Sequence, residues 1–119
     1  MRSKGFAYER HAERYLTKQG YAFRDRNYFT RCGEVDLIMT YNTSLVFIEV
    51  RYRKNNRFGS AEESITKAKQ HRIITSAKEY INRHKLWHMH IQFDVVTLTP
   101  CNKEDSVQLN WIKNAFTAS

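Results

Sequence analysis

Asp36 and Glu49 are acidic residues that could share a metal ion if they lie side by side. Each lies within an apolar run that is typical of a β-strand. The runs cover residues 33–40 and 45–53, and the polar residues between them favour a β-hairpin. With a hairpin loop of two or four residues, Asp36 lies directly opposite Glu49, with the Cβ atoms about 5 Å apart. The same register is expected to gather one apolar face from Val35, Leu37, Met39, Val46, Ile48 and Val50.

Opposed carboxylates repel each other and destabilise a sheet unless a positive group lies between them. Mg²⁺ or Mn²⁺ would supply that charge, since both are hard cations that bind carboxylate oxygens and retain waters for a phosphate substrate. An ion-pair ladder is the alternative, because Glu34 falls opposite Arg51 in the same register and Arg51 flanks Glu49. The hairpin therefore predicts a divalent-metal site, with an ordinary cluster of ion pairs as the competing interpretation.

Two expected helices bring further polar groups toward this hairpin. Residues 5–19 have helical apolar spacing, and Glu9 borders the buried stripe, where it is either a third acidic ligand or a surface charge paired with a neighbouring arginine. Thr66 can cap a second helix, in which Lys69 and Gln70 border the buried stripe near the N-terminus. Lys69 either reaches a phosphate there or extends to water along the core.

The remaining segments are predicted to be strands. Residues 21–29 are expected to form a strand with Tyr21 and Phe23 pointing inward, and residues 89–99 and 107–112 are expected to form two more. The expected order is helix, three strands, helix, two strands, in a single mixed α/β domain that covers residues 1–119.

The chain is basic, with a formal net charge of +8. A small basic domain attracts polyanions through counterion release, although the same charge also serves solubility. The polar segment from Tyr52 to Ser60 could follow a phosphodiester backbone or could be a solvated connection. We expect contacts to DNA from Arg53, Lys54, Arg57, Lys67, Lys69, Gln70 and Arg72.

Other features of the sequence favour a cytoplasmic protein. Cys32 and Cys101 are too few and too isolated for a disulfide framework or a zinc knuckle. The N-terminus leads into a polar amphipathic segment rather than an apolar signal sequence, and no stretch has the apolar length of a membrane span. We therefore expect reduced thiols and no membrane partner.

These motifs together resemble the pattern of the YraN family of small bacterial proteins, over nearly the whole chain. The resemblance is carried by GEVDLI at 33–38 and VFIEVRYR at 46–53, with Glu9, Ala12, Tyr15-Leu16, Phe58-Gly59, Thr66, Lys69-Gln70 and Phe93-Asp94-Val95 in the same order. That family in turn resembles the PD-(D/E)XK nuclease superfamily and is related to Holliday-junction resolvases. The resemblance implies a restriction-endonuclease-like mixed sheet with an αβββαβ core plus a C-terminal strand.

The resemblance also implies a ligand set for Mg²⁺ or Mn²⁺, made of Glu9, Asp36, Glu49 and the carbonyl oxygen of Val50. Arg51 stands where the superfamily usually has a catalytic lysine. Lysine can lose a proton when it is desolvated and activate water, whereas arginine stays charged. Either the metal alone activates water, or Lys69 supplies the amine, or the site is catalytically weak.

Three functions follow from these observations. The first is a metal-dependent endonuclease acting on DNA, branched DNA included, in which Asp36 and Glu49 hold the metal while Arg51 and Lys69 neutralise charge at the phosphate. The second is a DNA-binding protein on a nuclease fold without turnover. The third is a subunit whose basic surface meets an acidic protein. A resolvase-like role needs two opposed active sites and therefore predicts a homodimer.

Overall fold

The computed structural model of the chain describes residues 2–53, 65–101 and 106–118, with side chains from residue 7 onward. Its elements are α1 (Arg2–Lys18), β1 (Ala22–Thr30), β2 (Gly33–Tyr41), β3 (Ser44–Tyr52), α2 (Lys67–His84), β4 (His90–Pro100) and β5 (Val107–Phe116). The predicted order of elements is confirmed, and so is the mixed α/β class with an αβββαβ core and a C-terminal strand. Neither of the described helices is long and apolar enough to cross a membrane.

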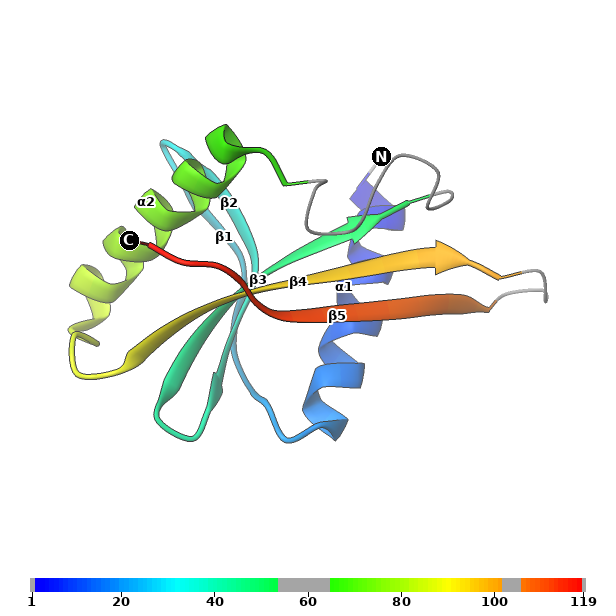
Figure 1. Ribbon diagram of the computed structural model, residues 1–119, viewed down its shortest axis with the longest axis horizontal. Helices are drawn as coiled ribbons and strands as arrows, with labels where there is room; N and C mark the ends of the chain where they lie inside the picture. The colour runs from blue at the N-terminus through cyan, green and yellow to red at the C-terminus, as the bar shows by residue number, and fades with distance from the viewer. Residues whose placement is uncertain (1, 54–64, 102–105, 119) are drawn as a thin grey trace.

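The strands form one sheet in the order β1-β2-β3-β4-β5. The first three make an antiparallel meander, β3 and β4 run parallel, and β5 returns antiparallel to β4. Parallel neighbours need a crossover connection, and α2 lies in the segment that links β3 to β4. Figure 1 shows the arm made by β1 and β2 diverging from the arm made by the end of β3, β4 and β5.

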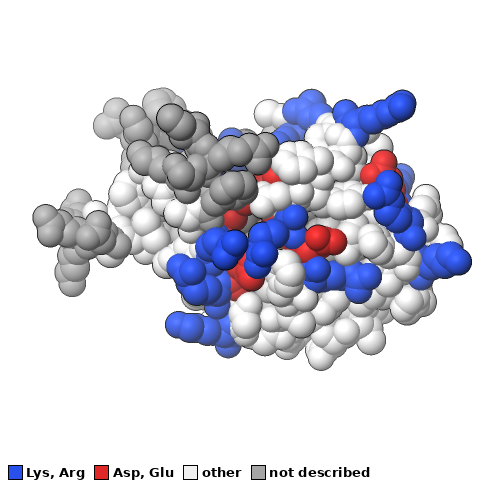
Figure 2. All heavy atoms as spheres, turned by 180° about the vertical axis from the view of Figure 1, so that it is seen from behind, with Lys and Arg blue, Asp and Glu red and all other residues white. Residues whose placement is uncertain are grey.

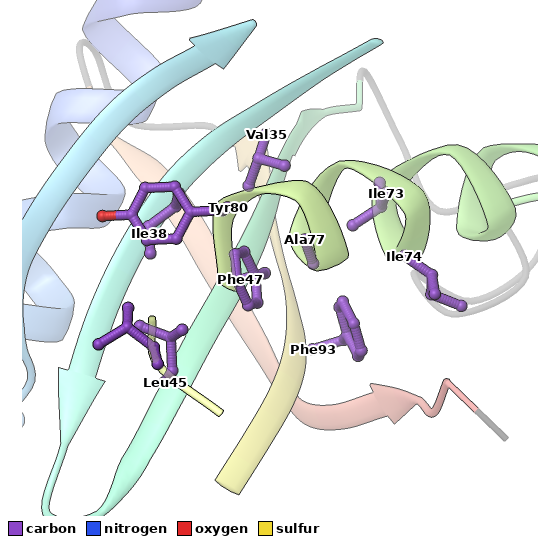
Figure 3. Packing of buried hydrophobic residues seen from close by; sticks show 10 residues of the cluster. Val35, Ile38, Leu45, Phe47, Ile73, Ile74, Ala77, Tyr80 and Phe93 are labelled. Carbon is purple, nitrogen blue, oxygen red and sulfur yellow. The ribbon is translucent and has the colours of Figure 1, made fainter. Parts of the chain in front are cut away.

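The helices cover opposite faces of the sheet because each strand alternates apolar side chains between its two sides. On the α2 side, Tyr80 and Ala77 pack with Phe47 and Phe93 (Figure 3). On the α1 side, a second cluster contains Ala12, Leu16, Leu37, Met39, Val46, Ile48, Val96 and Leu98. The Thr66 hydroxyl caps α2 by accepting a hydrogen bond from the Lys69 N–H at 3.1 Å, as predicted.

The central hairpin has the expected register as far as Leu37, but the expected direct pairing of Asp36 with Glu49 is not formed. Tyr41 lies opposite Ser44 across a two-residue loop, and the pairing of β2 with β3 continues to Leu37 opposite Ile48. Beyond that pair the strands diverge, and we call this point the fork (Figure 1). Asp36 is the next residue of β2, so the acidic part of the hairpin lies at the fork.

The side chains of β2 change their alternation between the two faces at the level of Asn27 in β1, and this change was not predicted. Asn27 has a φ of 52°, in the left-handed region that asparagine tolerates better than most residues. Across this level, Ile38 and Val35 both pack on the α2 side although they are three residues apart. In a regular strand they would face opposite sides. The expectation that Val35 shares a face with Leu37 was therefore wrong.

Two further expectations are corrected. Tyr21 is buried as predicted, but Phe23 is 44% exposed on the edge strand β1. The Arg26 guanidinium lies 4.3 Å from the centroid of its ring. The last strand was expected to end at residue 112, yet β5 continues to Phe116. The reason is apolar packing, since the Phe116 ring stacks on Phe93 with centroids 4.9 Å apart.

Candidate metal centre

Three carboxylates from two elements meet beside the fork. Oxygen atoms of Glu9 in α1 and of Glu34 and Asp36 in β2 lie within 4.8 Å of one another. Glu34 reaches Glu9 because the changed alternation of β2 turns its side chain toward α1. We call these three residues together with Glu49 the acidic centre.

Asn27 holds two members of the acidic centre together. Its Nδ2 atom donates to Glu9 Oε1 and to Glu34 Oε2, both at 2.8 Å. One turn further along α1, Glu13 accepts two hydrogen bonds of 3.1 Å from the Arg26 guanidinium. Adjacent residues of β1 therefore bind successive turns of α1, which fixes the helix against the edge of the sheet.

Asp36 is buried at the fork, with an exposed fraction of 9%. Its Oδ2 accepts a hydrogen bond of 2.9 Å from the Val50 N–H, which links the two strands just beyond the last paired residues. Burial raises the pKa of Asp36 to about 9, helped by the negative charge of Glu49 and then of Glu9 and Glu34, while the Val50 N–H opposes the shift. A cation bound here would offset the repulsion among these carboxylates, which adds to the effect of burial.

Glu49 faces the α2 side of the fork and has two basic neighbours. Lys69 Nζ lies 3.6 Å and Arg51 Nη1 lies 3.9 Å from Glu49 Oε2. Burial raises the pKa of Glu49, and the two cations oppose that rise. The structure therefore places Lys69 of α2 beside Glu49 of β3, next to Arg51.

The ion-pair interpretation is realised in part, because Arg51 pairs with Glu49, whereas Glu34 and Arg51 form no ion pair among the described residues. The pairing of β2 with β3 stops before these residues, and Glu34 joins Glu9 whereas Arg51 joins Glu49. Glu34 and Asn27 were both missed as members of the site. The nearness of Glu34 to Asp36 in the sequence was a usable clue, but Asn27, whose amide binds Glu34, lies on another strand.

The basic residues expected to contact DNA differ in their surroundings. Lys67 and Arg72 are exposed on α2, and Arg53 is half-buried with its N–H donating to the Leu98 carbonyl at 2.9 Å. Gln70 uses its side-chain amide within the fold, donating to the Ile65 carbonyl at 3.1 Å. Lys54 and Arg57 lie outside the described residues. Figure 2 shows acidic side chains lying between groups of lysine and arginine side chains on one face.

Asp94 lies in a separate hydrogen-bond network whose donors are uncharged groups. It is buried, and its carboxylate accepts hydrogen bonds from the side chains of Tyr21, Gln92 and Trp111 and from the Asn114 N–H. Gln92 also donates to the Tyr21 hydroxyl at 3.0 Å. The Gln92 amide therefore holds Asp94 against the Tyr21 hydroxyl.

The donor set of the acidic centre fits a hard divalent cation. Its members are carboxylates, which Mg²⁺ and Mn²⁺ prefer over nitrogen and sulfur. The Val50 N–H donates to Asp36, so the backbone of Val50, carbonyl oxygen included, lies next to the acidic centre. Lys69 and Arg51 place positive charge on one side of the carboxylates, where a phosphate oxygen could be bound.

Comparison with known proteins adds a family but no activity. The model of the uncharacterised protein family UPF0102 matches residues 8–98. A UPF0102 protein of Nitrosococcus oceani is 45% identical over 116 residues, covering 97% of this chain and 92% of the relative. Relatives in Vibrio campbellii and Clostridium perfringens are 38% and 37% identical, covering 98% and 97% of this chain and 93% and 94% of their own lengths. The matched span contains the whole acidic centre and Lys69.

Proposed function

The chain belongs to the uncharacterised protein family UPF0102, and on that premise we propose that it is a divalent-metal-dependent endonuclease of the PD-(D/E)XK type that hydrolyses phosphodiester bonds in DNA. One observation carries the proposal: Glu9, Glu34 and Asp36 lie within 4.8 Å of one another beside a fourth carboxylate, Glu49, that is paired with Lys69. Such a cluster in a protein of net charge +8 suits a metal ion and a polyanionic substrate.

The residues of the centre divide into two roles. Glu9, Asp36, Glu49 and the Val50 carbonyl would hold Mg²⁺ or Mn²⁺, and Glu34 adds a carboxylate to that set. A cation held there lowers the pKa of water and neutralises phosphate charge. Lys69 and Arg51 stabilise the negative charge that develops on the phosphate as the attacking oxygen approaches.

Lys69 supplies the amine that β3 lacks. Arg51 remains protonated and can only stabilise charge, whereas a lysine can also orient or deprotonate water. The Lys69 ammonium lies on the same carboxylate oxygen as the Arg51 guanidinium, so the two side chains flank one position. The active site would then draw its lysine from α2 instead of from the strand.

The surrounding charge would bind the DNA backbone without reading its sequence. Arg53, Lys67 and Arg72, with Lys54 and Arg57 outside the described residues, are the proposed phosphate contacts. We also propose that the protein resides in the cytoplasm, where the DNA of the cell lies. The branched-DNA version of the function requires a homodimer, because one centre cuts one strand.

Cleavage of labelled single-stranded, duplex, flapped and four-way DNA with Mg²⁺ or Mn²⁺ tests the proposal. We expect the wild-type protein to cut at least one of these substrates and Glu49→Gln to cut none. Titration calorimetry with Mn²⁺ should detect a site that Asp36→Asn removes. Absence of divalent-ion binding at millimolar concentration would overturn the proposal.

A DNA-binding protein without turnover is the second candidate, and Arg51 in place of lysine is the observation that favours it. That function predicts salt-dependent DNA binding that survives Asp36→Asn, and no cleavage after Arg51→Lys. Binding without cutting in both the wild type and Arg51→Lys would decide for it.

A further inference from the structure

Two tyrosine rings form a stack beside the acidic centre. Tyr8 in α1 and Tyr52 at the end of β3 have ring centroids 4.4 Å apart and an interplanar angle of 12°. Tyr8 also packs against the apolar cluster on the α1 side, so its position is supported from behind. Tyr52 is 41% exposed despite its aromatic ring. Tyr8 is therefore held by the apolar cluster, and the partly exposed ring of Tyr52 stacks on it.

The place of this stack ties it to the proposed active site. Tyr8 directly precedes Glu9, and Tyr52 directly follows Arg51, whose guanidinium lies 3.9 Å from Glu49. Each ring thus belongs to an element that also supplies a charged group to the site, and Tyr52 shares a face of β3 with Val50, whose N–H binds Asp36.

We propose that the Tyr8–Tyr52 stack binds an unpaired nucleobase next to the cleaved phosphate, so that the preferred substrate is DNA with a single-stranded segment. This inference rests on the proposed function. Aromatic rings bind single strands by stacking on successive bases, without regard to sequence. Bases inside a duplex are already stacked on their neighbours, and exposing one costs energy that a flap or a loop avoids.

The charge of the chain agrees with this substrate. The formal net charge is +8, and arginines precede and follow Tyr52 in the chain. By strand alternation the Arg51 side chain lies on the opposite face from Tyr52. A single strand presents phosphates and bases alternately, and grooves that bind it combine positive charge with aromatic rings. A pair that served only to pack α1 on the sheet would not need an exposed ring.

The test compares one labelled single strand with the duplex of the same sequence, in EDTA so that nothing is cut. We expect Tyr52→Leu to weaken single-strand binding about tenfold while leaving duplex binding unchanged, since leucine preserves apolar packing but cannot stack on a base. Tyr52→Phe should retain the wild-type affinity. Trp87→Leu is the matched control, because Trp87 is 63% exposed but lies beyond the far end of α2 from Lys69.

A second measurement needs no variant. A single strand that carries 2-aminopurine should lose fluorescence on binding the wild-type protein, because stacking on a tyrosine ring quenches that base. Equal weakening of single-strand and duplex binding by Tyr52→Leu, or unchanged 2-aminopurine fluorescence in the wild-type complex, would overturn the inference. Metal-dependent cutting of duplex DNA with no preference for single strands would overturn the inference alone, whereas absence of all DNA binding would overturn the proposed function too.

Discussion

Asp36 is a residue whose ionisation opposes folding when no cation is present. Its pKa is raised from 3.8 to about 9, first by burial and then by the charge of Glu49. Between these two pH values the unfolded chain has lost a proton that the folded chain keeps. The free energy of unfolding of the metal-free protein therefore falls as pH rises, by up to about 1.4 kcal/mol per pH unit from this group.

We predict that Asp36→Asn flattens this dependence, because the amide does not ionise and its oxygen can still accept the Val50 N–H. The measurement is urea unfolding in EDTA between pH 5 and pH 9. Wild type and variant should have similar stability at the low end of this range, and the variant should be more stable at the high end. The same slope in both proteins would show that Asp36 does not carry the effect.

Glu34 is the residue whose role differs most from the sequence-based expectation. Its oxygen lies with those of Glu9 and Asp36, so Glu34→Gln should lower Mn²⁺ affinity by about tenfold or more, the scale on which residues around a metal affect its binding. Glu79→Gln is the matched control, because this carboxylate accepts from the Tyr28 hydroxyl on the α2 side. Titration calorimetry measures both, and equal affinities would remove Glu34 from the ligand set.

At the scale of elements, local patterns predicted most of the architecture. The period-2 alternation of β2 and β3 and their polar turn predicted the hairpin register as far as Leu37 opposite Ile48. The fork was not predicted, and it replaces the expected direct pairing of Asp36 with Glu49. Helical periodicity and the Thr66 cap placed Lys69 at the start of α2. The position of Glu34 could not be obtained in this way, because it involves a hydrogen bond from Asn27 in β1 and a change of alternation in β2 that the local pattern does not show.

Asn27 therefore combines a backbone role with a side-chain role, and two substitutions separate them. Asn27→Gly keeps the left-handed backbone at little cost but removes the amide that binds Glu9 and Glu34. Asn27→Ala also forces an unfavourable φ, so we expect it to be less stable than Asn27→Gly by about 1 kcal/mol. Chemical unfolding measures the difference. Equal stability of the two variants would mean that β1 does not need the left-handed residue.

At the scale of the whole molecule, symmetry decides whether a four-way junction can be resolved. Each chain provides one acidic centre, so cutting two opposed strands requires two copies related by a twofold axis. We predict that the protein forms a dimer on four-way DNA, which light scattering of the complex would detect. Flapped DNA needs only one cut, and a monomer would suffice for it.

Mixed dimers supply the sharper form of this prediction. Wild-type protein mixed with excess Glu49→Gln should nick one strand of the junction and leave the opposed strand intact, because the inactive copy still occupies its half of the DNA. The proportion of doubly cut product should then fall as the square of the wild-type fraction, and that of singly cut product should pass through a maximum. If both products instead fell in direct proportion to the wild-type fraction, the copies would act independently, as expected for a monomer.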